Sequence, residues 1–269
     1  MAVLLRDIIA NGLCVVNVKR ARARARAAAN IPSVSKKDVE EFVLELPSYN
    51  EQLNVGQFFF NYDSLIALQQ QKLDKLKTLK KSCLEKMFLK DGETVPEIRF
   101  KGFEGPWEKK KLGELMLLGN GRDYKHLQYG NIPVYGTGGY MTSVNAILSD
   151  KDSIGIGRKG TIDKPYILKA PFWTVDTLFY ATPKEEVDLS YLFGLFQIID
   201  WRSKDESTGV PSLSKQNIND IELYSTCDTS EQRKIGSFFT KIDDLITLNQ
   251  QKLDKLKNLK KALLDKMFV

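Results

Sequence analysis

The chain has 269 residues, of which 42% are hydrophobic and 10% aromatic, so it can bury a sizeable core and does not have the composition of a disordered protein. No apolar run reaches the roughly 18 to 20 residues of a membrane span, and the apolar start of the chain is interrupted by Arg6, Asp7 and Asn11. Its three cysteines are widely separated and fit neither a metal site nor a disulfide framework. We therefore expect a protein of a reducing compartment, the cytoplasm, without membrane association.

The net charge of +6 is unevenly distributed. Residues 1–30 contribute +5 of it through the run KRARARARAAA and Arg6, with Asp7 as the one acid. Two interpretations of this basic, low-complexity segment stay open. It is either a solvated tail or an arm that contacts nucleic-acid phosphates.

A long segment occurs twice in the chain. Residues 51–88 align without a gap on residues 231–268, and 24 of the 38 positions are identical. The match continues upstream, where residues 31–46 align with residues 210–225. Solenoid repeats recur at roughly 20 to 50 residues, whereas these copies are about 180 residues apart. The pattern indicates a duplicated module with an insert between its copies.

Both copies predict a long helix. Leucines and isoleucines recur at helical spacing, neither copy contains Pro, and the only Gly is near the start. Such a helix would be ~57 Å long and needs a partner. We expect the copies to pair as an antiparallel coiled-coil hairpin, with ten leucines at the interface: Leu65, Leu68, Leu73, Leu76, Leu79, Leu245, Leu248, Leu253, Leu256 and Leu259. The lysines between them form either a solvated face or a contact with DNA or a partner.

The intervening residues, 95–228, have a different character. They hold most of the Gly, Pro and aromatic residues, and the β-branched and aromatic runs within GNIPVYGTGGYM, SIGIGRKGTIDKPYIL and PFWTVDTLFYAT predict strands. The segment VDLSYLFGLFQIIDWRS has helical spacing. We expect a compact mixed domain whose core contains Trp173 and Trp201. The fold class is therefore α+β, with one mixed α/β domain attached to the helical hairpin.

Catalytic signatures are absent or accidental. GIGRKG fits the dinucleotide-binding pattern, but the following TIDKPYILKAP contains two prolines and cannot open the required helix. A calcium-loop match from Asp150 fails because Ile154 takes a ligand position and Thr161 replaces the bidentate Glu. There is no P-loop motif, and His126 is the single histidine. We expect no enzyme activity, no metal and no cofactor.

Several segments, in the same order, resemble the DNA-specificity subunits of type I restriction-modification enzymes. They are PEIRFKGFEGPWEKKKLGEL, GNIPVYGTGGYM, FWTVDTLFY, STGVPSLSKQNINDIEL and EQRKIGSFFTKIDDLI, and the duplicated helical region is typical of the same family. The resemblance covers residues 31–269. It implies target-recognition domains, each reading one half of a split double-stranded DNA target, held apart by two long helices.

The resemblance also implies partners and boundaries. Methyltransferase (modification) subunits would dock on the helices, and restriction/translocase subunits would join through the complex. Residues 31–94 would be the end of a first recognition domain plus the central helix, residues 95–228 a complete recognition domain, and residues 229–269 the distal helix, with residues 1–30 unassigned. By this comparison the chain is a truncated form with one complete recognition domain. We expect a monomer, with a homodimer formed by helix exchange as its competitor.

Residues that read DNA must reach it from loops. The candidates come from three loops and are Arg122, Tyr124, Lys125, His126, Gln128, Thr137, Tyr140, Arg158 and Lys159. Each also has a structural interpretation, since Tyr and His pack in cores, glycine-rich loops satisfy turn geometry and Arg is an ordinary surface charge. The alternative function is a truncated interaction protein that pairs through its helices with other specificity or methyltransferase subunits without reading DNA.

Overall fold

The computed structural model describes residues 46–89 and 92–267. The basic segment 1–30 and residues 31–45 of the repeated segment 31–46 lie outside the described residues. The chain divides into two compact units, one of Met1–Lys75 with Ile246–Val269 and one of Leu76–Leu245. We call the described parts of these the helical unit and the mixed unit.

Two helices of equal length carry the sequence repeat. Helix α4 spans Tyr49–Met87 and α8 spans Thr229–Met267, each with 39 residues. The Asp228 carboxylate caps the start of α8 by accepting hydrogen bonds from the amides of Ser230 and Glu231 at 2.8 and 3.2 Å. The prediction of two long helices is confirmed.

In the helical unit, side-chain contacts run between α4 and α8 in antiparallel order. Gln69 Nε2 donates to Asn249 Oδ1 at 2.8 Å, and Lys260 Nζ donates to Asp63 Oδ1 at 2.5 Å. Gln69 and Asn249 occupy the same position in the two copies of the repeat. An antiparallel pair related by a two-fold axis brings a residue against its own counterpart only at the axis. This contact therefore marks the approximate two-fold axis of the hairpin.

The seam between these helices is narrower than the leucine pattern predicts. It consists of buried or half-buried side chains spaced by three and four residues: Ile66, Gln69, Leu73, Ile246, Asn249 and Leu253. Leu73 and Leu253 are each 1% exposed. Outside this set, Leu76 and Leu256 are half-buried, and six of the ten expected interface leucines are exposed: Leu65, Leu68, Leu79, Leu245, Leu248 and Leu259. The reason is geometric, because a pair of helices buries about two positions in seven.

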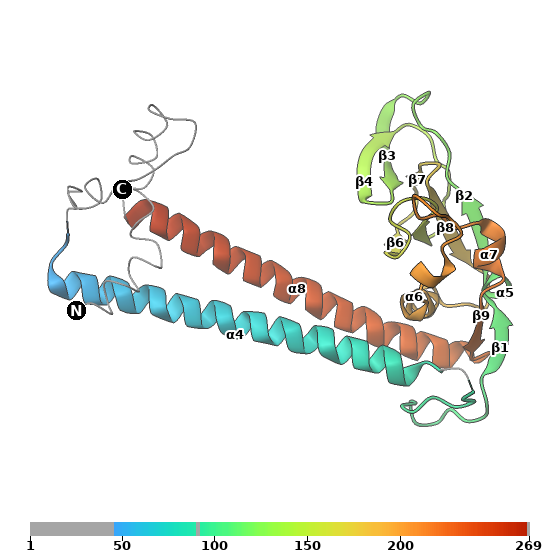
Figure 1. The fold of residues 1–269 in the computed structure, drawn as a ribbon, viewed down its shortest axis with the longest axis horizontal. Coiled ribbons are helices and arrows are strands. Elements are labelled where there is room, and N and C mark those ends of the chain that lie inside the picture. Colours follow the sequence, from blue (N-terminus) through green and yellow to red (C-terminus); the bar gives the residue numbers. More distant parts are fainter. Residues whose placement is uncertain (1–45, 90–91, 268–269) are drawn as a thin grey trace. The chain divides into compact units, whose positions relative to one another are not determined.

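The mixed unit contains three small sheets (Figure 1). Strands β1 (Glu108–Lys111) and β9 (Glu222–Ser225) form an antiparallel pair. An antiparallel four-stranded sheet has the order β2 (Met116–Asn120), β8 (Leu178–Pro183), β5 (Ser153–Gly157) and β6 (Tyr166–Leu168). The third sheet has the order β4 (Gly139–Val144), β3 (Tyr129–Gly136) and β7 (Trp173–Thr174), with β3 and β7 parallel.

Short helices complete the mixed unit: α5 (Leu112–Leu115), α6 (Leu189–Ile198), α7 (Lys215–Asn219) and the 3₁₀ turn η2 (Arg202–Lys204). Asp188 caps α6 by accepting from the Tyr191 amide at 2.9 Å. The predicted strands and helix of this region are confirmed in type.

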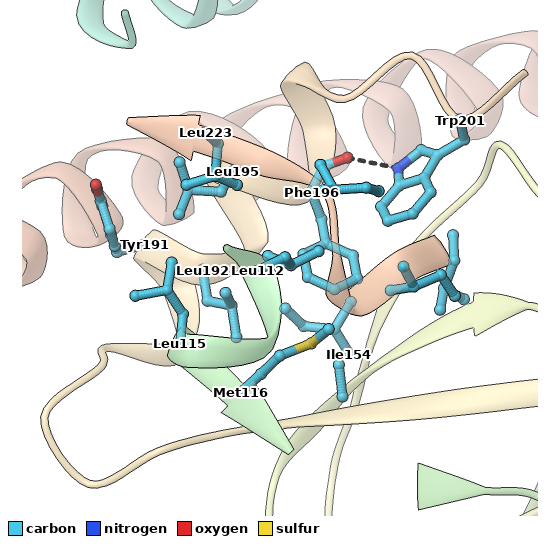
Figure 2. Close-up of a cluster of buried hydrophobic side chains, with 14 of the residues drawn as sticks. Leu112, Leu115, Met116, Ile154, Tyr191, Leu192, Leu195, Phe196, Trp201 and Leu223 are labelled. Atoms are coloured by element: carbon cyan, nitrogen blue, oxygen red, sulfur yellow. Dashed lines mark hydrogen bonds between the residues drawn. The ribbon is translucent and has the colours of Figure 1, made fainter. Parts of the chain in front are cut away.

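The main core packs α6 against strands from two of the sheets (Figure 2). Leu192, Leu195 and Phe196 of α6 are fully buried, and Ile154 of β5 lies in the same cluster. Trp201 is 2% exposed and donates its indole N–H to the Phe196 carbonyl at 2.8 Å. A second cluster contains Trp173, which is 6% exposed. Both tryptophans are core residues, as predicted.

Within the mixed unit, the start of α8 is anchored by polar groups. Glu231 is fully buried and receives two hydrogen bonds from the Arg99 guanidinium, Nε to Oε1 at 2.6 Å and Nη2 to Oε2 at 2.9 Å. Gln232 accepts from the Asp188 amide at 3.0 Å and donates to the Thr226 carbonyl at 2.9 Å. The first turn of α8 is therefore held by a specific, satisfied network.

Candidate nucleic-acid interface

A tight turn between β7 and β8 organises the candidate interface. We call residues 175–178 the central turn. The Leu178 amide donates to the Val175 carbonyl at 2.9 Å, which closes a β-turn with Asp176 and Thr177 at its two central positions. Val175 and Leu178 are buried in the second core cluster, whereas Asp176 is exposed. The turn is therefore fixed at both ends and presents Asp176 to solvent, while Thr177 is half-buried.

The basic loop of residues 121–128 is attached to this turn. The Arg122 amide donates to the Thr174 carbonyl at 2.8 Å, and the Gly121 amide donates to the Leu178 carbonyl at 3.1 Å. A Cβ on Gly121 would lie 1.8 Å from the Val175 carbonyl oxygen, so only glycine permits this approach. The Trp173 indole donates to the Arg122 carbonyl at 2.9 Å and packs edge-on to the His126 ring. The loop is held by its backbone, which leaves its charged side chains outward.

The tip of the β3–β4 hairpin reaches the same turn. The Val175 amide donates to the Tyr135 carbonyl at 3.0 Å, one residue before the hairpin turn begins. Gly139 closes that turn with φ 105°, a conformation that favours glycine. Tyr140, the next residue, is 63% exposed, and its hydroxyl is 3.1 Å from Ser143 Oγ.

The third predicted loop, after β5, is also attached to the central turn. The Arg158 and Lys159 amides point to the Thr177 carbonyl at 2.8 and 3.4 Å. The Arg158 guanidinium lies 5.8 Å from the centre of the Phe179 ring, and both basic side chains are exposed. The three loops therefore converge on one five-residue stretch, 174–178. We call them, with the central turn, the loop cluster.

A further segment, residues 205–213, supports the Arg158 loop from its other side. The Leu213 amide donates to the Arg158 carbonyl at 2.9 Å, and Lys159 forms a β-bridge with Ser212. Asp205 holds this segment in shape by accepting from the amides of Ser212 at 2.9 Å and Ser207 at 3.0 Å. These amide donors lower the pKa of the Asp205 carboxyl below its ordinary value.

Most of the predicted residues are available for contact. Arg122, Lys125, His126, Gln128, Tyr140, Arg158 and Lys159 are exposed, while Tyr124 and Thr137 are half-buried. Tyr124 packs against the second core cluster, which matches its structural interpretation. Gln128 lies apart from the loop cluster. Its carbonyl accepts from the Asn145 amide, and the eight-residue strand β3 separates it from the hairpin tip by roughly 20 Å or more.

The sequence pattern missed the central turn itself. Asp176 and Thr177 sit between two apolar strands, so the pattern predicted strand there. The only local signal was a polar pair interrupting an apolar run.

The loop cluster offers exposed hydrogen-bond donors on an ordered backbone. Exposed guanidinium and ammonium groups suit phosphate oxygens and guanine edges, and the backbone anchors pre-order the loops. Within residues 46–89 and 92–267, no group of three or more His, Cys, Asp or Glu side chains is arranged so that it could hold a metal ion. In the same part of the chain, no helix combines the length and apolar character needed to cross a membrane.

Sequence and structure comparisons place the chain among known proteins. Residues 104–258, more than half of the chain, match the family described as the type I restriction modification DNA specificity domain. The chain is 26% identical over 102 residues to the type I restriction enzyme MjaVIII specificity subunit of Methanocaldococcus jannaschii. That alignment covers 37% of this chain and 24% of the relative, well under two thirds of its length.

Two solved structures share the fold. The S subunit of the type I restriction-modification system from M. genitalium superposes with a TM-score of 0.66 at 20% identity, covering 96% of this chain and 72% of that one. The HsdS subunit from Thermoanaerobacter tengcongensis superposes with a TM-score of 0.55 at 16% identity, covering 95% and 68%. At these identities the superpositions establish a common fold, and the family match establishes kinship. The chain belongs to the type I restriction-modification DNA specificity family.

Proposed function

We propose that the chain is a non-catalytic DNA-recognition subunit of a type I restriction-modification system, and that residues 95–228 read one half of a bipartite double-stranded target. The observation that carries this proposal is the convergence of three loops on the central turn, two of which carry basic side chains. Arg122, Arg158 and Lys159 are exposed there on backbones held by hydrogen bonds. A rigid, basic and solvent-facing cluster is what base reading combined with phosphate contact requires.

Binding of labelled duplex DNA tests this proposal directly. The purified chain is titrated with a randomised duplex pool, and bound sequences are recovered and counted. We expect one short motif to be enriched, and replacing Arg122 or Arg158 by Ala to flatten it at one base position. Lys169→Ala is the matched control, because Lys169 is exposed and paired with Asp152 outside the loop cluster. Binding that is equally strong for all sequences would contradict base reading.

We further propose that the helices dock methyltransferase subunits. The six exposed leucines support this, because they form three pairs of repeat counterparts: Leu65 with Leu245, Leu68 with Leu248, and Leu79 with Leu259. Apolar side chains exposed on long helices beyond their seam are available to a partner. Because the repeat duplicates them, they suit two copies of one partner, and restriction/translocase subunits would join through that complex.

The docking proposal is tested by methylation in cells. The chain is expressed with its methyltransferase subunit, and the modified motif is read by sequencing of methylated DNA. Replacing Leu68 and Leu248 by Ser should abolish modification while leaving the melting temperature and the DNA motif of the isolated chain unchanged. Retained modification would contradict docking at these leucines.

The oligomeric state and location follow as part of the same proposal. Both helices lie in one chain, so we propose an intramolecular hairpin that works in the cytoplasm, where its DNA is. A homodimer that exchanges helices would bury the same seam. Light scattering of the purified chain distinguishes a 30.6 kDa monomer from a particle of twice that mass.

A further inference from the structure

Asp176 is an acidic residue at the centre of a basic surface. It occupies a middle position of the central turn and is exposed. Thr174 lies two residues before Asp176 and Thr177 directly after it, and their carbonyls accept the backbone hydrogen bonds of Arg122 and Arg158, so the two basic loops flank Asp176. DNA held by both loops would therefore lie against the turn that carries Asp176.

The carboxylate of Asp176 has no structural partner in the part of the chain that the structure describes. Within the described residues, Asp176 forms no hydrogen bond or ion pair through its side chain. Other aspartates of the mixed unit do have such partners: Asp205 accepts from two amides, and Asp163 pairs with Arg202 at 2.7 Å. The flanking Arg122 and Arg158 do not pair with Asp176 either. Its acceptor oxygens are therefore free to bind a ligand.

The chemistry of DNA decides which group would face it. A carboxylate opposite a phosphate is repelled, and opposite the N7 and O6 acceptors of guanine it is also unfavourable. Adenine offers an amino group, but its N7 acceptor lies beside it in the major groove. Cytosine offers the N4 amino group without a second acceptor on the same base, and carboxylates accept from it. Arginines on either side would suit guanines of the same or the next base pair.

We propose that Asp176 is a specificity-determining residue that accepts a hydrogen bond from the N4 amino group of a cytosine in the major groove. This inference rests on the proposed DNA-recognition function and names one base contact within it. The turn geometry supports the assignment, because the backbone bonds at Thr174, Val175 and Thr177 fix the direction of the turn. A pre-ordered acceptor of this kind discriminates against a base that cannot donate by roughly 5- to 150-fold.

The experiment compares the full chain with three variants by selection from a duplex pool with a randomised central block. Asp176→Ala removes the acceptor, and Asp176→Asn keeps the size of the side chain but adds a donor. Asp150→Ala is the control, since Asp150 is likewise exposed and unpaired among the described residues. Asp150 precedes strand β5, whereas Arg158 follows that strand, so the two residues lie at opposite ends of β5. Asp176→Ala and Asp150→Ala remove the same charge.

We expect the unmodified chain to enrich a motif with cytosine at one position. Asp176→Ala should reduce that preference to within about two-fold at this position only, and Asp176→Asn should move it toward adenine at the same position. Asp150→Ala should leave the motif unchanged. If Asp176→Ala fails to fold, which its melting curve reports, the nearly isosteric Asn variant still gives the answer.

Two results would overturn the inference separately from the proposed function. An enriched motif that Asp176→Ala and Asp176→Asn leave intact, with affinity rising for all sequences as in Asp150→Ala, would make Asp176 an ordinary surface charge. Loss of preference at a position that does not favour cytosine would refute the assigned base. An unmodified chain that enriches no motif would overturn the proposed function, and this inference with it.

Discussion

Removal of the Arg99 side chain should destabilise the mixed unit strongly. The Arg99 guanidinium makes two hydrogen bonds to Glu231. The side chain of Glu231 is 0% exposed and that of Arg99 is 12% exposed. The hydrogen bonds to Glu231 raise the pKa of Arg99 above its ordinary value, so the guanidinium stays charged. Arg99→Ala leaves the carboxylate buried without its partner, which typically costs about 3–5 kcal/mol.

The position of Arg99 favours the lower end of this range of destabilisation. Arg99 lies at the edge of the core, so water can enter the vacated space and the lower end, about 3 kcal/mol, is expected. For a chain of this size that corresponds to a fall in Tm of roughly 6–12 °C. Urea unfolding and calorimetry of the full chain measure both quantities. The double variant Arg99→Ala/Glu231→Gln should recover part of the loss, because it removes the unpaired charge.

The internal repeat supplies the matched control. Glu51 is the counterpart of Glu231 in the first copy, and it is exposed. Glu51→Gln should therefore change the free energy of unfolding by less than about 0.5 kcal/mol. A loss below about 1 kcal/mol for Arg99→Ala, or equal losses for Glu51→Gln and Glu231→Gln, would show that the buried pair does not anchor α8.

Three further predictions concern the seam and the loop cluster. Leu73→Ala should lower the free energy of unfolding by about 2–3 kcal/mol because Leu73 is 1% exposed, whereas Leu79→Ala on the same helix should lower it by under about 1 kcal/mol. Equal losses for the two variants in urea unfolding would contradict the seam. Gln69→Leu should destabilise by about 1–3 kcal/mol, since it removes the hydrogen bonds that Gln69 donates to Asn249. Gln69→Leu with Asn249→Leu should raise Tm and yield additional oligomers by light scattering. Lys159→Ala should weaken binding to all duplexes alike and lower the salt slope by about one unit, so a change in the selected motif would contradict a phosphate contact.

The sequence determined the helical part of this protein to a large extent. The duplication, the helical spacing of leucines and the absence of proline predict two long paired helices, and α4 and α8 confirm them. Strand and helix types in the mixed unit were also predictable, because alternation and periodicity are local properties. Trp173 and Trp201 were assigned to the core from residue type alone.

The choice of leucines that form the seam depends on how the two helices pack. Leu68 and Leu73 are the same residue type on the same helix, yet Leu68 is 62% exposed and Leu73 is 1% exposed. Their burial depends on the register between two helices, which Gln69 and Asn249 mark by their contact. Periodicity identifies a broad apolar stripe and cannot say which part of it a single partner helix covers.

The candidate interface depended on the tertiary structure still more. The sequence predicts three separate loops. It does not predict the central turn that joins them, because this turn lies between two apolar strands. Their convergence arises from pairings between distant parts of the chain, such as the parallel contact of β3 with β7 and the backbone bond from Arg158 to Thr177. Short stretches of sequence determine side-chain chemistry and local conformation. Arg122 and Thr177 are about 55 residues apart in the sequence, yet their loops meet. The pairing and packing of the strands bring these loops together, and no local pattern encodes that pairing.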